Sequence, residues 1–267
     1  MLRDITLGQY FPGDSIIHRL DPRTKILMVV VYLVALFTAN HVVSMVLVAS
    51  FLGLMIALSR VKPRLLLRGL RPLIIILTIT GLFNLFLTPG EPILSVWIIT
   101  ITAEGLCRAV FLVVRIVMMV MGTFILTYTT APMALTDGLE SLMGPLKRIR
   151  VPVHELALIM SMALRFIPNL IEETDRIMRA QKARGADFET GNLFKRAKAL
   201  IPLLIPLFMS AFRRADELAI AMESRCYHGG AGRTRMRQLK FARRDVLTGL
   251  TGVGLLTVVI GLVVMGR

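Results

Sequence analysis

Polar positions interrupt the long apolar stretches of this chain at only a few places. Residues 26–58 are apolar apart from an interruption at residues 38–41. That length is too great for one untilted membrane span and slightly short for two. Basic residues flank both ends, and positive residues mark the cytoplasmic side of a membrane. Both ends are therefore expected inside, which predicts two short helices with a turn at Asn40.

Three further apolar stretches each have the length of one membrane-spanning helix. They cover residues 72–88, 106–128 and 246–265. Residues 93–102, between the first two, are rich in β-branched side chains and predict a short extended segment on the outer side. Arg115 falls inside a predicted span. It either makes a polar contact inside the bundle or snorkels or pairs locally, and the second interpretation is preferred.

Residues 153–230 contain two segments built to one plan, and each is expected to be a helical arm outside the membrane. Each begins apolar with helical spacing, becomes charged, and ends in an Arg beside small residues. In the first arm acidic residues precede basic ones, which suits the helix macrodipole. Gly185 fits the left-handed position after a helix. Pro168 predicts a bend or a restart of this helix.

Composition places the chain in a membrane. Of its 267 residues, 55% are hydrophobic, and the mean hydropathy is +0.70. Soluble domains are rarely so apolar. A formal net charge of +15 would suggest nucleic acid in a soluble chain. Here the basic residues lie beside apolar runs, so the lipid bilayer is the expected partner and nucleic acid is not.

The predicted fold is an all-α integral membrane protein with about five transmembrane helices plus cytoplasmic coupling helices. An amphipathic stripe in residues 131–150, broken at Gly144-Pro145, predicts an interfacial helix on the cytoplasmic side. A basic run, residues 233–244, needs no role beyond contact with lipid headgroups. The expected organisation is an N-terminal cytoplasmic or interfacial arm (1–25), four spans (26–130), a cytoplasmic coupling domain with three helices (131–245) and a last span (246–267).

Three motifs carry a resemblance to a known family. They are Gln181-Lys182-Ala183-Arg184-Gly185, Ala221-Met222-Glu223-Ser224-Arg225-Cys226, and the N-terminal run from His18 to Lys25. Together they resemble the transmembrane T subunit (EcfT/CbiQ) of energy-coupling factor (ECF) transporters, a family that includes the Q subunit of cobalt and nickel uptake systems. One departure is Cys226, where the family usually has Gly. The first motif ends in the triplet Ala183-Arg184-Gly185 and the second in the triplet Ser224-Arg225-Cys226. The departure predicts a weaker need for positive φ in the second triplet.

The resemblance implies a non-catalytic scaffold of an ATP-driven importer for a vitamin or a transition metal. The implied partners are two ABC-type ATPase subunits, which bind the ATP, and one small membrane-embedded substrate-binding S subunit. The chain itself would hold no cofactor. It would lie in a bacterial or archaeal cytoplasmic membrane with its N-terminus inside. The residues implied to dock the ATPases are Ala183, Arg184, Gly185, Ser224, Arg225 and Cys226.

A surface for the S subunit is the second candidate site. Small and adaptable side chains recur along both arms. They either pack within the coupling region or form a plastic surface that accepts different S subunits, and the sequence does not separate these two. The candidates are Met160, Met178, Met209, Ala211, Ala215, Ala219 and Met222.

Two functions of other classes stay open at this point. A permease subunit of another ATP-driven importer would line the substrate path itself. A membrane-embedded hydrolase would use Glu172 and Glu173, but the E-E-x-x-x-R spacing is one residue short and no His-rich second motif follows. The Gly-rich run at residues 229–233 lacks the G-K-[ST] ending of a P-loop. Cys226 and His228 are too few to ligate a metal, so no metal site is expected.

Overall fold

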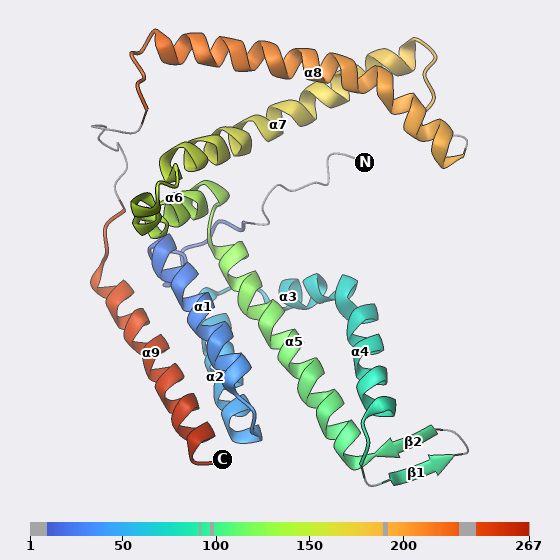
Figure 1. Cartoon of the computed structure of the whole chain (residues 1–267), viewed down its shortest axis with the longest axis vertical. Coiled ribbons are helices and arrows are strands. Elements are labelled where there is room, and N and C mark those ends of the chain that lie inside the picture. Colours follow the sequence, from blue (N-terminus) through green and yellow to red (C-terminus); the bar gives the residue numbers. More distant parts are fainter. Residues whose placement is uncertain (1–9, 91, 97–98, 189–191, 230–238, 267) are drawn as a thin grey trace. The chain divides into compact units, whose positions relative to one another are not determined.

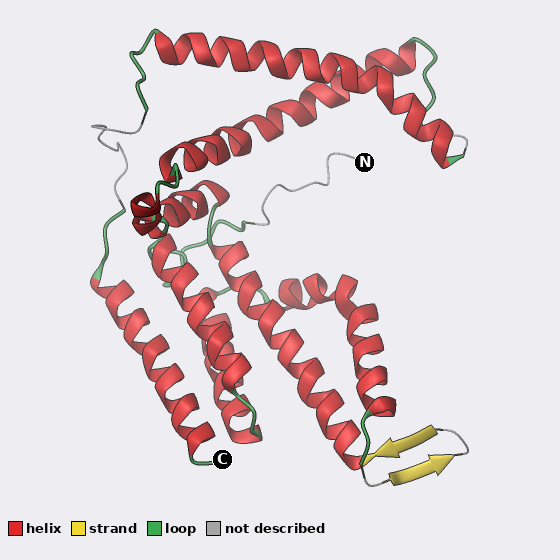
Figure 2. Cartoon of the chain, viewed as in Figure 1, coloured by secondary structure: helices red, strands yellow, loops and turns green. Residues whose placement is uncertain are grey.

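The computed structural model describes residues 10–90, 92–96, 99–188, 192–229 and 239–266. The described chain is helical apart from one two-stranded hairpin (Figures 1 and 2). The helices are α1 (Pro22–Thr38), α2 (Val42–Ser59), α3 (Pro63–Leu70), α4 (Ile74–Leu87), α5 (Ala103–Thr129), α6 (Pro132–Leu142), α7 (Val153–Ala183), α8 (Leu193–Glu223) and α9 (Arg243–Val264), with short 3-10 turns at Arg71–Leu73 and Gly144–Ile149. The strands are β1 (Pro92–Val96) and β2 (Ile99–Thr102), which pair antiparallel.

The chain divides into two compact units. The first, which we call the bundle, consists of Gly8–Leu139 and Leu239–Arg267, and the second comprises Glu140–Gln238. Helices α1 to α5 and α9 lie in the bundle, whereas α7 and α8 form most of the second unit. The predicted basic run at residues 233–244 falls partly outside the described residues.

Most predicted spans have a counterpart in the bundle. The apolar stretch from residue 26 to 58 is two helices, and they meet at a turn that contains Asn40, as predicted. The predicted extended segment is the β1–β2 hairpin between α4 and α5. Helix α3 had no prediction, because its short run of leucines and arginines was too brief to show a period against its apolar surroundings.

Five described helical stretches are long and apolar enough to cross a membrane. Four of them match predicted spans, namely α2, the stretch Pro63–Leu87, α5 and α9. The fifth is α7, which the sequence assigns to an arm; it has the lowest mean hydropathy of the five. Helix α1 has 17 residues, slightly fewer than any of these. It nevertheless packs along α9, α5 and α2.

The bundle core is formed where α1, α2, α5 and α9 meet. Tyr32, Leu36, Val48, Met118 and Val259 are among its buried side chains. Two glycines allow the helices to approach closely, as small residues do in membrane bundles. A Cβ atom on Gly122 would lie 2.5 Å from the Tyr32 ring, and one on Gly252 would lie 2.5 Å from the Met28 sulfur.

Arg115 joins α5 to the turn between α1 and α2. Its guanidinium donates to the Ala39 carbonyl oxygen at 2.6 Å and to the Asn40 side-chain oxygen at 3.3 Å. It also lies over the Phe111 ring, 5.0 Å from the centroid. A cation at the C-terminal end of α1 complements the helix dipole. Arg115 therefore makes a polar contact between segments of the bundle, and the preferred interpretation of snorkelling or local pairing is wrong.

The two arms are long helices. α7 and α8 each have 31 residues, and α7 continues through Pro168 while α8 continues through Pro202 and Pro206. The predicted possibility that the first helix restarts at Pro168 is therefore wrong. A proline removes one backbone donor and crowds the preceding turn, but the flanking residues keep the helix continuous.

Candidate coupling site

Helix α7 ends in a capping motif built by the first triplet. The Ala186 amide donates to the Gln181 carbonyl oxygen at 3.0 Å, and the Gly185 amide donates to that of Lys182 at 3.0 Å. This pair of bonds is the Schellman motif, in which the residue after the C-cap takes a left-handed conformation. Gly185 has φ +90°. Arg184 is thus the C-cap residue.

Helix α8 ends in the same motif at the second triplet. The Tyr227 amide donates to the Met222 carbonyl oxygen at 3.1 Å, and the Cys226 amide donates to that of Glu223 at 2.8 Å. Cys226 has φ +53°. The expectation that cysteine here weakens the need for positive φ is therefore wrong, because the Schellman bonds impose the left-handed backbone whichever residue occupies the position.

The two arginines occupy equivalent places at these helix ends. Each follows a small residue, Ala183 or Ser224, and precedes the left-handed residue. Arg184 and Arg225 are exposed, and within the described part of the chain neither side chain has a hydrogen bond or an ion pair. A guanidinium at a helix C-terminus is favourably placed against the dipole. Its fork of donors stays available to a partner's carboxylates or carbonyls.

The two arginines lie at opposite ends of the α7–α8 pair. Within this unit the two helices cross and run in opposing directions (Figure 1). Arg225 shares a pocket with Leu158 and Met162 from the first third of α7. Arg184 is 22 residues beyond Met162 on the same helix, which corresponds to about 33 Å at 1.5 Å per residue. One small binding site could not receive both.

Polar contacts hold this unit together. Arg214 of α8 forms an ion pair with Glu173 of α7 at 3.3 Å, and both side chains are partly buried. His154, at the start of α7, contacts the Glu140 carboxylate at 3.1 Å. Glu173 therefore has a structural partner, and its neighbour Glu172 is exposed. No group of three potential metal-ligating side chains occurs among the residues the structure describes.

The pocket beside Arg225 has a volume of about 400 Å³. Leu158 and Met162 of α7 line one side, and Leu218 and Met222 of α8 line the other. Cys226 and His228, considered above as too few to hold a metal, also border it. The lining therefore combines apolar side chains of both helices with the polar side chains of Arg225, Tyr227 and His228.

The candidate S-subunit residues do not form one patch. Ala211, Ala215 and Ala219 are exposed and, four residues apart, share one face of α8. Met209 is exposed near the same region, and Met222 is half-buried at the pocket described above. Met160 and Met178 are both on α7, but 18 residues separate them, which is about 27 Å.

A buried polar cluster in the bundle was not predicted as such. Lys25 donates to the Thr129 carbonyl oxygen at 2.8 Å, linking α1 to the end of α5. Asp245 accepts from the Asp21 amide and from the Ala242 amide, both at 2.8 Å, linking α9 to the start of α1. The motif from His18 to Lys25 gave the only sequence signal, since it contains two of these residues.

Comparison with known proteins identifies the family. The model of the family described as "CbiQ: Cobalt transport protein" matches residues 13–236. A protein of Thermosediminibacter oceani is 52% identical over 257 residues, covering 95% of this chain and 97% of that protein. One of Acidaminococcus fermentans is 54% identical over 255 residues, covering 96% and 95%. Both are named "Energy-coupling factor transporter transmembrane protein EcfT".

The chain belongs to the CbiQ/EcfT family. This confirms the resemblance on which the two triplets were singled out. EcfT proteins are transmembrane transporter components and are not catalytic, so the hydrolase alternative is dropped and the prediction that the chain is not an enzyme is confirmed. With several helices apolar enough to span a bilayer, this EcfT-family chain is a multi-pass membrane protein.

Proposed function

We propose that the chain is the scaffold of an ECF-type importer, in which α7 and α8 transmit the movement of ATPase subunits to a substrate-binding S subunit. Arg184 and Arg225 are the contact points for the ATPases, each with its flanking small and left-handed residues. ATP is bound by those partners, and this chain holds no cofactor. The cargo belongs to the class of vitamins or transition metal ions.

The observation that carries this proposal is the pair of matched helix ends. Arg184 and Arg225 have the same capping geometry, are both exposed and belong to the same unit. The length of α7 between Arg184 and the pocket that holds Arg225 is nevertheless about 30 Å. Two equivalent contacts at such a separation suit two ATPase subunits better than one. Because the Schellman bonds fix the backbone on both sides of each arginine, docking requires little ordering of the chain.

A rigid helix is needed to transmit force from these ends. α7 and α8 cross and are joined by the Arg214–Glu173 ion pair. Closure of two ATPases would move the two arginine ends relative to one another, and the crossing point would convert that movement into a rotation of the pair. Among the described residues, the Arg214–Glu173 ion pair is partly buried and few apolar side chains of α7 and α8 are buried, so the pair can change its crossing angle with a small loss of free energy.

The exposed surface of α8 is the proposed site for the S subunit. Phe208 and Phe212 are 61% and 66% exposed, and they flank the small residues Ala211 and Ala215. Large apolar side chains beside alanines permit close helix packing with a membrane partner. Met209 and Ala219 of α8 extend this surface in the proposal, whereas Met160, Met178 and Met222 lie outside it.

The proposed orientation places the N-terminus and both arginine ends in the cytoplasm. Basic residues gather at one end of the bundle, in the segment before α1 and the segment after α2, whereas the α4–β1 connection is free of them. Positive residues favour the cytoplasmic side. The membrane would be the cytoplasmic membrane of a bacterium or archaeon.

Charge reversal tests the docking role. Arg184→Glu together with Arg225→Glu should abolish co-purification of the ATPases and transport, while membrane insertion stays at the wild-type level. The matched control is Arg176→Glu with Arg213→Glu, which makes the same charge change at exposed positions of the same two helices. Wild-type yields of two ATPase subunits with the triplet variant would overturn the proposal. Specific substrate binding by the isolated chain would instead favour a permease.

A further inference from the structure

A basic cavity lies within the bundle. It has a volume of about 660 Å³, within the range of roughly 300–1,000 Å³ common for ligand sites. Three separate segments of the bundle contribute: the turn before α1, the C-terminal end of α2 and the first turn of α9. The lining residues are Asp14, Ser15, Ile16, Arg19, Ala57, Leu58, Arg60 and Arg244.

Positive charge in this cavity is not balanced by the chain. Arg19, Arg60 and Arg244 bring three positive charges, and Asp14 brings one negative charge. Arg19 pairs with Asp14 at 3.4 Å, with the side chains 58% and 90% exposed; such exposed pairs are weak. Arg60 and Arg244 have no acidic partner anywhere in residues 10–90, 92–96, 99–188, 192–229 or 239–266. An anion would therefore be attracted here.

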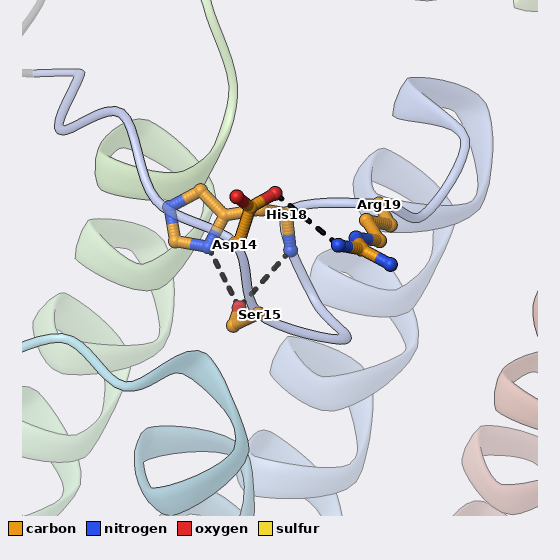
Figure 3. A network of polar contacts seen from close by, with 4 residues as sticks. All are labelled: Asp14, Ser15, His18 and Arg19. Carbon is orange, nitrogen blue, oxygen red and sulfur yellow. Dashed lines mark hydrogen bonds and ion pairs between the residues drawn. The ribbon is translucent and has the colours of Figure 1, made fainter.

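The turn that carries Arg19 is fixed by its own hydrogen bonds. The Ser15 hydroxyl is 2.7 Å from the Nδ1 atom of His18, and the His18 amide donates to the same hydroxyl at 3.2 Å (Figure 3). The Nε2 atom of His18 lies 3.0 Å from the Phe11 carbonyl oxygen. These contacts hold Asp14 and Arg19 side by side in a turn with little freedom, so a ligand need not order it.

Arg60 brings a positive charge to the cavity from a constrained backbone position. It is the C-cap residue of α2 and has φ +54°. A left-handed backbone suits Gly or Asn, and any larger side chain there is disfavoured by roughly 1–2 kcal/mol. A cation here complements the dipole at the C-terminal end of α2, and the same guanidinium borders the cavity.

Apolar surface continues from the cavity along the two helices. Ile16 and Leu58 in its lining are 55% and 36% exposed. One turn further along α2 lies Leu54, and three residues beyond Arg244 lies Leu247, 55% and 63% exposed. A soluble phosphate would leave this apolar surface exposed to water, whereas acyl chains would cover it. Basic pockets between transmembrane helices bind anionic lipid headgroups.

We propose that this cavity binds the headgroup of an anionic phospholipid, with the phosphate on Arg19, Arg60 and Arg244 and the acyl chains along α2 and α9. The lipid would anchor the basic end of the bundle at a fixed depth. The bundle would then resist the movement that the proposed coupling helices apply. The lipid site itself does not depend on the proposed coupling role, because all its residues belong to the bundle.

Lipid retention tests the site. The full-length chain, purified in neutral detergent after exposure to vesicles of phosphatidylcholine with cardiolipin or phosphatidylglycerol, should retain one anionic lipid in native mass spectrometry. Arg19→Gln with Arg60→Gln and Arg244→Gln should lower retention at least about tenfold. The matched control, Arg64→Gln with Arg68→Gln and Arg71→Gln, removes the same charge from exposed positions beside α3 and should retain the lipid.

A single substitution separates loss of the lipid site from misfolding of the triple variant. Arg60→Asn suits the left-handed backbone better than arginine and should lower retention about threefold with an unchanged elution profile. Equal retention by the wild type and the triple variant would overturn the site. An equal loss of lipid retention in the α3 control would also overturn the site, because it would show that retention depends on the total positive charge and not on these three arginines. Binding of inorganic phosphate at millimolar concentration, with no lipid retained, would overturn the proposal of a lipid ligand and assign the three arginines to soluble phosphate.

Discussion

The bundle and the α7–α8 pair differ in where their side chains find partners. In the bundle, six residues of α1 and seven of α5 are buried. In α7 the buried residues are Val153 and Ala157, and of the described side chains of α8 only Leu203 is buried. The bundle therefore supplies its own core, whereas the pair leaves most of its apolar surface for other molecules.

Charged groups follow the same division. Lys25, Asp245 and Arg115 of the bundle bind backbone groups within the bundle. Arg184 and Arg225 are exposed at the ends of their helices, and among the described residues their side chains have no hydrogen-bond or ion-pair partner. Buried charges that are hydrogen-bonded across a bundle favour one packing, whereas exposed charges at rigid helix ends are available to a partner protein. The comparison predicts that mutations will affect stability in one unit and association in the other.

The largest effect on stability is expected for Asp245→Ala. This change removes the acceptor for the Asp21 and Ala242 amides and a negative charge near buried Lys25. Hydrogen bonds to charged groups contribute about 1.5–3 kcal/mol each, so we expect a loss of about 3 kcal/mol in the free energy of unfolding, measured in detergent. Asp216→Ala, at an exposed position on α8, should change it by less than about 0.5 kcal/mol.

A smaller loss is expected for Gly122→Ala. The new methyl group would meet the Tyr32 ring at 2.5 Å, and overpacking costs about 1–3 kcal/mol. Gly254→Ala is the matched change in α9, where a Cβ meets nothing within 4 Å, and it should be neutral or slightly stabilising. Thermal unfolding of the two variants measures the difference. Equal stabilities would mean that α1 and α5 do not approach as closely as described.

The smallest effects concern the helix ends and have opposite signs. Gly185→Ala puts a side chain at φ +90° with open space around it, so backbone strain of about 1 kcal/mol should weaken ATPase binding roughly fivefold. Cys226→Gly relieves strain at φ +53° and should strengthen binding or leave it unchanged. Titration of the purified ATPases gives both values. Tighter binding by the Gly185→Ala variant would contradict a role for the capping geometry.

Patterns of apolar residues were sufficient to predict most of the bundle. The turn at Asn40, the extended backbone after α4 and the spans at α5 and α9 follow from local hydropathy and charge, which act along the chain. The pairing of that extended segment into a hairpin was not predicted. The triplets could be found because family resemblance and helix-end chemistry both point to them. A glycine such as Gly185 directly after a helix also predicts a left-handed backbone.

Contacts between distant segments could not be predicted in the same way. Nothing near Lys25 in the sequence shows that its partner is the Thr129 carbonyl, or that Asp245 caps two segments. The cavity of Arg19, Arg60 and Arg244 also exists only after α2 and α9 pack together. The prediction for Cys226 failed for a different reason. The identity of the residue suggested a weaker need for positive φ, whereas the Schellman hydrogen bonds require a left-handed backbone there.

The central claim is that each arginine end contacts its own ATPase subunit. A photo-crosslinking residue placed at Ala186 and another at His228, two and three residues beyond the arginines, test it in the assembled complex. We predict that each single-site chain joins one ATPase subunit, that the double-site chain joins two, and that a crosslinker at Val246 on α9 joins none. Double-site chains that never join more than one ATPase subunit, or none at all, would contradict the claim.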